Sequence, residues 1–374
     1  MTDKYIIGEI QTPVGNIPQV STKLNIEDYL GTVMVRWSIN RDNYKVKPGL
    51  YAVGNPTALS DVFVTANYKL SFDHLRKNLA DLNAWLLILD TRGINVWCAA
   101  GKGTFGSQEL INRIRLTKLD AVISHRRIIL PQLGAVGISA YQVKKATESV
   151  HTGSAIINPS QLQTSKLSFS PESLKTNRGF NVVYGPVRAK DIKEFVNNGY
   201  KATKEMRKVT FNFTDRIKLI PVDLVYSRYR LLLAFALIFI LSGLSRTGLS
   251  FHLAYEKGLY GLLNLFLAYV SGIVITPALL PYIPVKSFAF KGFITGIILS
   301  TVLLSFNKLG SSYPEMLSWF LLISGISSFL AMNFTGSSTY TSLSGVKKEM
   351  KVAVPIQIAF SIIGLILFVV GKLK

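Results

Sequence analysis

The chain has 374 residues, of which 49% are hydrophobic and 17% are charged, and it contains one cysteine. A single thiol excludes an intrachain disulfide and any zinc or iron–sulfur site built from several cysteines. The formal net charge is +21. The Lys and Arg residues are scattered and accompany no nucleic-acid motif, so we do not expect nucleic acid as a partner.

Charge and hydropathy divide the chain into two parts. Residues 1–230 hold 32 of the 42 Lys and Arg residues, whereas long apolar runs dominate the remainder. We predict a cytoplasmic domain over 1–215, a basic juxtamembrane linker over 216–230 and a transmembrane domain over 231–374. The basic stretch before the first span would meet anionic membrane lipid.

Strand and helix patterns alternate in the first part. Such alternation is typical of an α/β fold, here a Rossmann-like parallel sheet flanked by helices. Ser71 is the expected N-cap of a helix with Phe72, Leu75 and Leu79 on one stripe. Strands are expected over 32–37, 62–65, 86–90, 121–124, 127–130 and 181–184, and further helices over 107–119 and 189–197.

The second part contains five apolar stretches of membrane-spanning length. Lys and Arg in the flanking loops number nine on one side and five on the other, which favours a cytoplasmic N-terminal domain in the inner membrane. No cleavable signal peptide is recognisable ahead of that domain, in agreement with this orientation. The spans are expected over 231–249, 259–281, 287–306, 315–334 and 352–371.

Three glycines follow the only cysteine. Gly101, Gly103 and Gly106 match G-x-G-x-x-G ahead of a predicted helix, so a dinucleotide site is one interpretation. The preceding strand, however, ends more than ten residues before Gly101, and the tight strand-to-loop turn of that site is missing. We favour glycines that let the backbone approach a flat, bulky ligand. For Cys98 alone, a buried structural thiol is the ordinary alternative.

Cys98 lies in the run Asn95-Val96-Trp97-Cys98-Ala99-Ala100-Gly101-Lys102-Gly103-Thr104-Phe105-Gly106. This run resembles the signature of the corrinoid protein of the mercury-methylation pair, a membrane-bound relative of the large subunit of the corrinoid iron–sulfur protein. The iron–sulfur relatives carry a cysteine-rich cluster module, for which this chain has no cysteines. Segments 64–68, 130–135, 184–189 and 333–336 are also similar to the family.

The resemblance implies a chemistry for Cys98. In that family the cysteine lies on a short helix that caps a corrinoid, and its thiolate ligates the cobalt. A thiolate is a soft, electron-rich ligand, which would ease departure of a cobalt-bound methyl group toward inorganic Hg(II). The expected activity is therefore a corrinoid-dependent methyltransferase that forms methylmercury.

The resemblance also implies a corrinoid-binding set around Cys98. Asn95 and Trp97 would shape the cap and Lys102 would help to hold it. Small residues after the cysteine would let the helix touch the ring, and Thr65 would hydrogen-bond the thiolate or the cap backbone. Residues 132–134 and 184–185 follow strands, where open α/β sheets gather ligand-binding groups. The full set is Thr65, Asn95, Val96, Trp97, Cys98, Ala99, Ala100, Gly101, Lys102, Gly103, Phe105, Gly106, Gln132, Leu133, Gly134, Tyr184 and Gly185.

Two partners follow from this reading. The chain has no redox centre of its own, so a ferredoxin-like protein with iron–sulfur clusters would return the cobalt to its reduced state, and a folate-type methyl donor would reload it. Two alternatives stay open. One is a corrinoid methyl carrier of one-carbon, acetyl-CoA-type metabolism, and the other is a ligand-binding membrane transporter or receptor.

Overall fold

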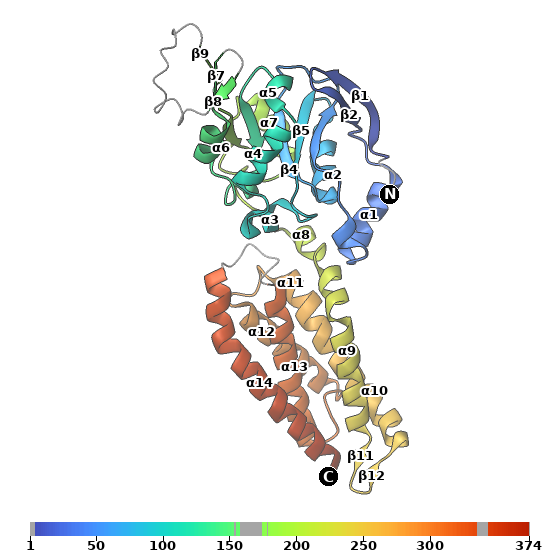
Figure 1. Ribbon diagram of the computed structural model, residues 1–374. Coiled ribbons are helices and arrows are strands. Elements are labelled where there is room, and N and C mark those ends of the chain that lie inside the picture. Colours follow the sequence, from blue (N-terminus) through green and yellow to red (C-terminus); the bar gives the residue numbers. More distant parts are fainter. Residues whose placement is uncertain (1–3, 153–154, 158–173, 178, 335–342, 374) are drawn as a thin grey trace. The chain divides into compact units, whose positions relative to one another are not determined.

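A computed structural model describes the chain except residues 1–3, 153–154, 158–173, 178, 335–342 and 374. Two compact units make up the chain (Figure 1). One comprises Met1–Val35 and Ile39–Val209, and the other comprises Arg36–Ser38 and Thr210–Lys374. In segment 333–336, which is similar to the mercury-methylation family, residues 335–336 lie outside the described residues.

A seven-stranded, mostly parallel sheet forms the centre of the N-terminal unit, in the order β1-β2-β3-β5-β4-β6-β10. The run β5-β4-β6-β10 is parallel throughout, while β3 is antiparallel to β5 and β1 is antiparallel to β2. The strands are β1 (Ile6–Thr12), β2 (Gly15–Val20), β3 (Gly49–Val53), β4 (Val62–Ala66), β5 (Ala84–Leu89), β6 (Arg127–Leu130) and β10 (Asn181–Tyr184). A small second sheet pairs β7 (Ser149–Thr152) with β8 (Ala155–Ile157) and β9 (Leu174–Asn177).

Helices cover both faces of this sheet, which confirms the predicted α/β class (Figure 1). Every residue of β5 is buried, as expected for a strand covered on both sides. Leu87 and Leu89 pack toward α3 to α6, and Leu86 and Ile88 pack toward α2 and α7. The helices are α1 (Ile26–Arg36), α2 (Lys69–Asn78), α3 (Val96–Lys102), α4 (Ser107–Leu116), α5 (Leu119–Val122), α6 (Ala140–Thr147) and α7 (Ile192–Asn197), with the 3-10 turns η1 (Arg41–Asn43), η2 (Gln132–Gly134) and η5 (Ala189–Asp191).

Three local predictions were wrong. Residues 32–37 are not a strand, because a reciprocal cap starts α1: the Asn25 side chain accepts from the Asp28 N–H and the Asp28 carboxylate accepts from the Asn25 N–H. Residues 121–124 contain the end of α5, which follows Lys118 in the left-handed conformation. Helix α2 begins at Lys69, two residues before Ser71, and its N-cap Tyr68 makes no side-chain cap bond.

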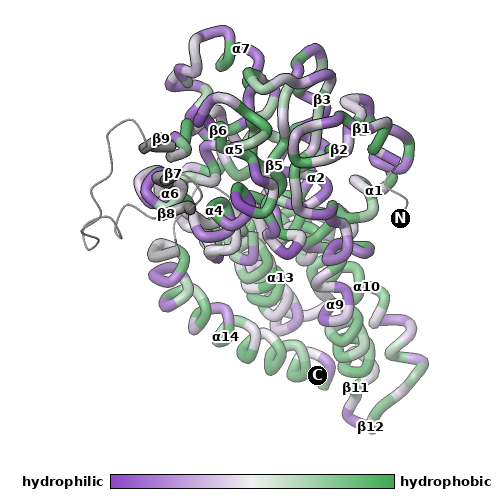
Figure 2. Tube along the Cα trace, turned by 45° about the horizontal axis from the view of Figure 1, so that its top comes forward, coloured by the Kyte–Doolittle hydropathy of each residue, from purple (hydrophilic) through white to green (hydrophobic). Residues whose placement is uncertain are grey.

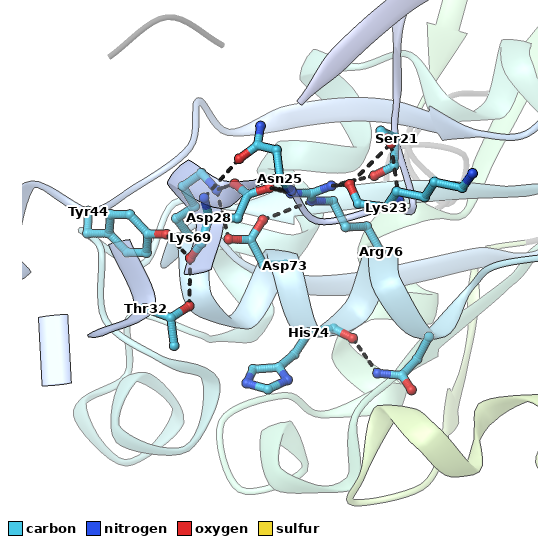
Figure 3. A network of polar contacts seen from close by, with 11 residues as sticks. Ser21, Lys23, Asn25, Asp28, Thr32, Tyr44, Lys69, Asp73, His74 and Arg76 are labelled. Carbon is cyan, nitrogen blue, oxygen red and sulfur yellow. Dashed lines mark hydrogen bonds and ion pairs between the residues drawn. The ribbon is translucent and has the colours of Figure 1, made fainter. Parts of the chain in front are cut away.

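A buried network of charges joins α1 to α2 (Figure 3). Arg76, which is fully buried, lies 2.6 Å from Asp28 and 2.8 Å from Asp73. Lys69 contacts both carboxylates and Arg76 also donates to the carbonyl of Ser21. Burial alone would raise the pKa of Asp28, but the hydrogen bond from Lys69 and the nearby cations outweigh it and hold that pKa below its ordinary value.

Asp28→Asn should destabilise the N-terminal unit by about 3–5 kcal/mol, because it leaves Arg76 and Lys69 short of a buried partner. The lowered pKa of Asp28 means that its ion pairs contribute stability at neutral pH, which is lost as the pH falls through the folded-state pKa. Urea unfolding of the full chain in detergent, followed by tryptophan fluorescence across pH, measures both effects. Asp81→Asn is the control, since the Asp81–Lys193 pair is exposed and should matter little. An Asp28→Asn variant as stable as its control would contradict this role.

The second unit consists of long apolar helices, coloured mostly hydrophobic in Figure 2. Five of the described helices are long and apolar enough to cross a membrane, which confirms the predicted number. These five are Phe213–Ser242, Phe251–Leu279, Phe288–Ser305, Tyr313–Asn333 and Gly345–Leu373. The elements within them and between them are α8 (Phe213–Ile217), α9 (Ile220–Ser242), β11 (Leu244–Ser245), β12 (Gly248–Leu249), α10 (Phe251–Val270), the π-turn η6 (Ser271–Ile275), α11 (Thr276–Leu279), α12 (Phe288–Ser305), α13 (Tyr313–Asn333) and α14 (Leu343–Leu373).

The boundaries of the first span differ from the prediction. The basic stretch 216–230 is helical, in α8 and the first half of α9, and the expected span 231–249 runs past the end of α9 into the hairpin β11–β12. Ser245 closes this hairpin by donating to the carbonyl of Gly248. The apolar run therefore continues through a turn, which hydropathy alone does not detect.

Small residues and hydroxyls hold α13 against its neighbours. A Cβ on Gly292 of α12 would lie 2.4 Å from the Ser327 carbonyl oxygen, so only glycine permits this approach. Ser327 also bonds Ser271 through their hydroxyls at 2.8 Å. Close backbone contact and interhelical hydrogen bonds are the interactions that join helices in lipid, where the hydrophobic effect offers no preference.

Candidate functional site

Helix α3 carries the only cysteine and has well-defined ends. The Asn95 side chain caps its start by accepting from the Cys98 N–H at 2.9 Å. Gly103 ends it in the left-handed conformation, with φ of 80°, which glycine adopts without strain. The thiol of Cys98 is unbonded and exposed. The alternative of a buried structural cysteine is therefore wrong.

The inner face of α3 packs into the core of the N-terminal unit. Ala99 is fully buried, Ala100 and Val96 are nearly so, and all three belong to the core that includes β4 and β5. This differs from the expectation that the two alanines would touch a ligand. Their small size serves packing instead, because the chain at Gly137 lies directly against Ala100.

The outer face of α3 presents Trp97, Cys98, Gly101 and Lys102, all exposed. Trp97 retains 41% of its surface, unusual for a large apolar ring. A Cβ added to Gly101 would meet no atom within 4 Å, so the space one turn from the thiol is open. This face therefore offers a soft ligand, an aromatic surface and an unobstructed helix backbone side by side.

Asn67, at the carboxyl end of β4, fixes the loop that leads into α3. Its side-chain oxygen accepts three hydrogen bonds, from the N–H and hydroxyl of Thr91 and from the N–H of Gly93, at 2.9–3.1 Å. Its nitrogen donates to Asp90 at 3.1 Å. Asn67 is 2% exposed. The site prediction missed this residue, although a buried amide directly after a central strand is a recognisable signal.

The loop after β6 contacts α3 and Phe105 closely at two glycines, where a side chain would not fit. A Cβ on Gly134 would lie 2.4 Å from the ring of Phe105, and one on Gly137 would lie 2.1 Å from the Phe105 carbonyl oxygen. The structure thus brings together the predicted residues Phe105, Gly134 and the α3 run. Gly137 was not predicted.

The loop after β10 joins the same edge of the sheet. The Tyr184 hydroxyl donates to the Ile138 carbonyl at 2.7 Å, and the Gly185 N–H donates to the Leu130 carbonyl at 2.7 Å. The Gln132 N–H donates to Pro186. These predicted residues bind the loops to one another, and Leu133 packs beside them against the core.

Thr65 lies in the buried strand β4. Strand alternation puts it on the face of β4 that Phe63 shares, whereas Val64 and Ala66 pack with α3. Thr65 is 4% exposed. Its proposed bond to the thiolate or the cap backbone stays a prediction.

The glycine pattern does not form a dinucleotide loop. Gly101 lies inside α3, so a helix separates β5 from the glycines, and Gly106 directly precedes α4. A phosphate-binding loop needs the strand to turn straight into the helix N-terminus. The geometry supports the interpretation that these glycines serve packing and access around α3.

Comparison with known proteins finds similarity to subunits of acetyl-CoA synthase and decarbonylase/synthase complexes. Residues 22–160 match the family model of the CO dehydrogenase/acetyl-CoA synthase delta subunit. The gamma subunit of the acetyl-CoA decarbonylase/synthase complex from Methanopyrus kandleri is 33% identical over 93 residues, which are 24% of this chain and 20% of that protein. The residues that match the family model, 22–160, include Asn67, α3 and η2.

Two further gamma subunits show a similar identity and coverage. The subunit from Archaeoglobus fulgidus is 30% identical over 28% of this chain and 23% of its own length. The subunit from Methanocaldococcus jannaschii is 32% identical over 30% of this chain and 24% of its own length. This chain therefore spans less than a quarter of each of these relatives.

Gly137→Ala should destabilise the N-terminal unit by several kcal/mol, because its Cβ would collide with backbone atoms of Phe105 and Ala100. Gly101→Ala is the matched control. It adds the same methyl group in open space within a helix and should be neutral or stabilising by about 1 kcal/mol. Urea unfolding of the two variants measures the difference. Equal losses in both would contradict the packing described for α3.

Proposed function

We propose that this chain is a corrinoid-dependent methyltransferase that transfers a methyl group from cobalt to inorganic Hg(II), forming methylmercury. The observation that carries the proposal is the exposed thiol of Cys98 on the rigidly held helix α3. The similarity of the surrounding unit to subunits of acetyl-CoA decarbonylase/synthase complexes supports a role in one-carbon transfer.

The outer face of α3 fits a flat cofactor with a metal at its centre. Cys98 would hold the cobalt through its thiolate, since sulfur is a soft ligand. Gly101 leaves the adjacent backbone uncovered, and Trp97 offers an aromatic surface beside the thiol. When bound, the corrinoid supplies a cobalt ion that can carry a methyl group.

The residues around Cys98 present the thiolate and keep it in place. Sγ is exposed, so its proton can pass to water when the sulfur binds a metal. Asn95 satisfies the backbone N–H of Cys98, and Asn67 holds the approach to α3. Because neither side chain bonds the sulfur, the thiolate stays free for the metal.

The proposal includes two partners and a location. The chain's one cysteine cannot hold an iron–sulfur cluster, so we propose a ferredoxin-like protein as the electron donor and a folate-type methyl donor. We also propose that the five apolar helices anchor the chain in the inner membrane with the N-terminal unit in the cytoplasm.

A second candidate is a methyl carrier of acetyl-CoA-type metabolism, with mercury as an accidental acceptor. The names of the relatives favour this candidate over a transporter or receptor. Offering the methyl-loaded protein Hg(II) or an acetyl-CoA synthase acceptor separates the two. Faster transfer to Hg(II) supports the first proposal, and faster transfer to the synthase supports the second.

Cys98→Ala should abolish methylmercury formation and change the visible spectrum of the bound corrinoid, while the unfolding midpoint stays close to that of the unmodified chain. The side chain is small and exposed, so its loss removes a ligand and little packing. Anaerobic spectra and activity with a low-potential reductant measure these effects. Full activity of the variant would rule out a thiolate ligand.

Gly101→Leu is the complementary change. It fills the open space beside the thiol and should weaken corrinoid binding by about tenfold or more, about 1.4 kcal/mol, without loss of stability. Gly101→Ala serves as the smaller control. Unchanged corrinoid affinity in the leucine variant would mean that the cofactor does not bind against this face.

The single thiol also reports the orientation. A membrane-impermeant maleimide should leave Cys98 unlabelled in spheroplasts, whose inner membrane is intact. It should label Cys98 after that membrane is permeabilised. Labelling of the intact preparation would put the N-terminal unit on the opposite side of the membrane.

A further inference from the structure

Helix α1 leaves most of its large apolar side chains exposed. Its buried residues are Asp28, Gly31 and Val35. Ile26 is 77% exposed, and Tyr29, Leu30 and Val33 retain 53%, 57% and 55% of their surfaces. These four positions follow the i, i+3, i+4, i+7 spacing of one helix face. An apolar stripe of this kind ordinarily faces a core, and here it faces outward.

The stripe cannot turn inward, because the buried side of α1 is fixed to the domain. Asp28 pairs with Arg76 at 2.6 Å and with Lys69, and it also closes the cap with Asn25 (Figure 3). A Cβ on Gly31 would lie 2.5 Å from the Tyr44 hydroxyl, so the helix rests on that ring. Rotating α1 would break a buried ion pair and this contact together.

Away from α1, exposed apolar side chains such as the following three have no such spacing. Leu59, Leu116 and Val136 are 77%, 64% and 84% exposed and lie far apart in the sequence. Single exposed apolar residues are common on protein surfaces, whereas a contiguous row points to something that covers it.

We propose that the outward face of α1 inserts into the interfacial layer of an anionic bilayer. The same chain carries five membrane-length helices, so a bilayer is always close to this domain. Residues 1–230 hold 32 Lys and Arg residues against 18 Asp and Glu residues, which suits a negatively charged lipid surface. Tyr29 has the apolar ring and polar tip that favour the headgroup level.

This inference does not depend on the proposed methyl transfer. It concerns a surface outside the α3 site and adds a second kind of membrane contact to the spanning helices. The insertion depth of such a helix is shallow, so its apolar face would meet acyl chains while the exposed Glu27, at the edge of the stripe, stays in water.

The test uses a nitroxide spin label at Val33→Cys in a Cys98→Ala background, with the full chain in vesicles of phosphatidylcholine and phosphatidylglycerol. Lys77→Cys on α2, also exposed, is the matched control. Power saturation with oxygen, which concentrates in lipid, and with a water-soluble nickel chelate measures what surrounds each label. We expect oxygen access to exceed nickel access several-fold at residue 33 and the reverse at residue 77.

Each other outcome would overturn the proposal. Equal nickel access at residues 33 and 77 would mean that the stripe faces water. Protection of residue 33 from both reagents would mean that protein covers it, either a partner or another part of this chain. The same lipid signature in vesicles of phosphatidylcholine alone would overturn the proposed requirement for anionic lipid. Since Val33 is exposed, the label should not disturb folding, and urea unfolding of both variants checks this.

Discussion

The carboxamide of Asn67 connects the central sheet to the reactive helix. It satisfies three donors of the loop that follows β5 and donates to Asp90, and Asn67 itself is buried. A buried amide with every group bonded fixes its neighbours more firmly than an apolar contact, since any displacement leaves several polar groups unpaired. The position of α3, and with it that of Cys98, depends on this one side chain.

The two faces of helix α3 have different roles: the inner face packs against the core and the outer face is exposed. Its inner residues Ala99 and Ala100 are as small as the neighbouring loop requires, while its outer residues Trp97 and Cys98 are exposed. The two faces can therefore change independently: a substitution inside alters stability, and one outside alters what the helix binds. A seven-residue helix with a firm cap at each end is sufficient for this, because its neighbours supply the rigidity.

Patterns within the sequence predicted the α/β class, the central strands and the number of membrane helices, since these follow from periodicity and run length. These patterns failed where a single contact determines the local structure. The reciprocal cap between Asn25 and Asp28 starts a helix that includes 32–36 despite their Val and Thr residues. The apolar stripe of α1 faces outward, so its helical spacing does not mark core positions. Likewise, the run around Cys98 gave no sign of which residues point inward, because that depends on Gly137, distant in sequence.

The lone cysteine has a consequence for the proposed substrate. Hg(II) is itself a soft ion that prefers sulfur, so a protein with two neighbouring thiols would chelate it and release it slowly. These 374 residues contain only Cys98 and cannot chelate mercury between two thiolates of their own. Under the proposed function, Hg(II) on this chain would therefore stay exchangeable with the thiols of the surrounding solution.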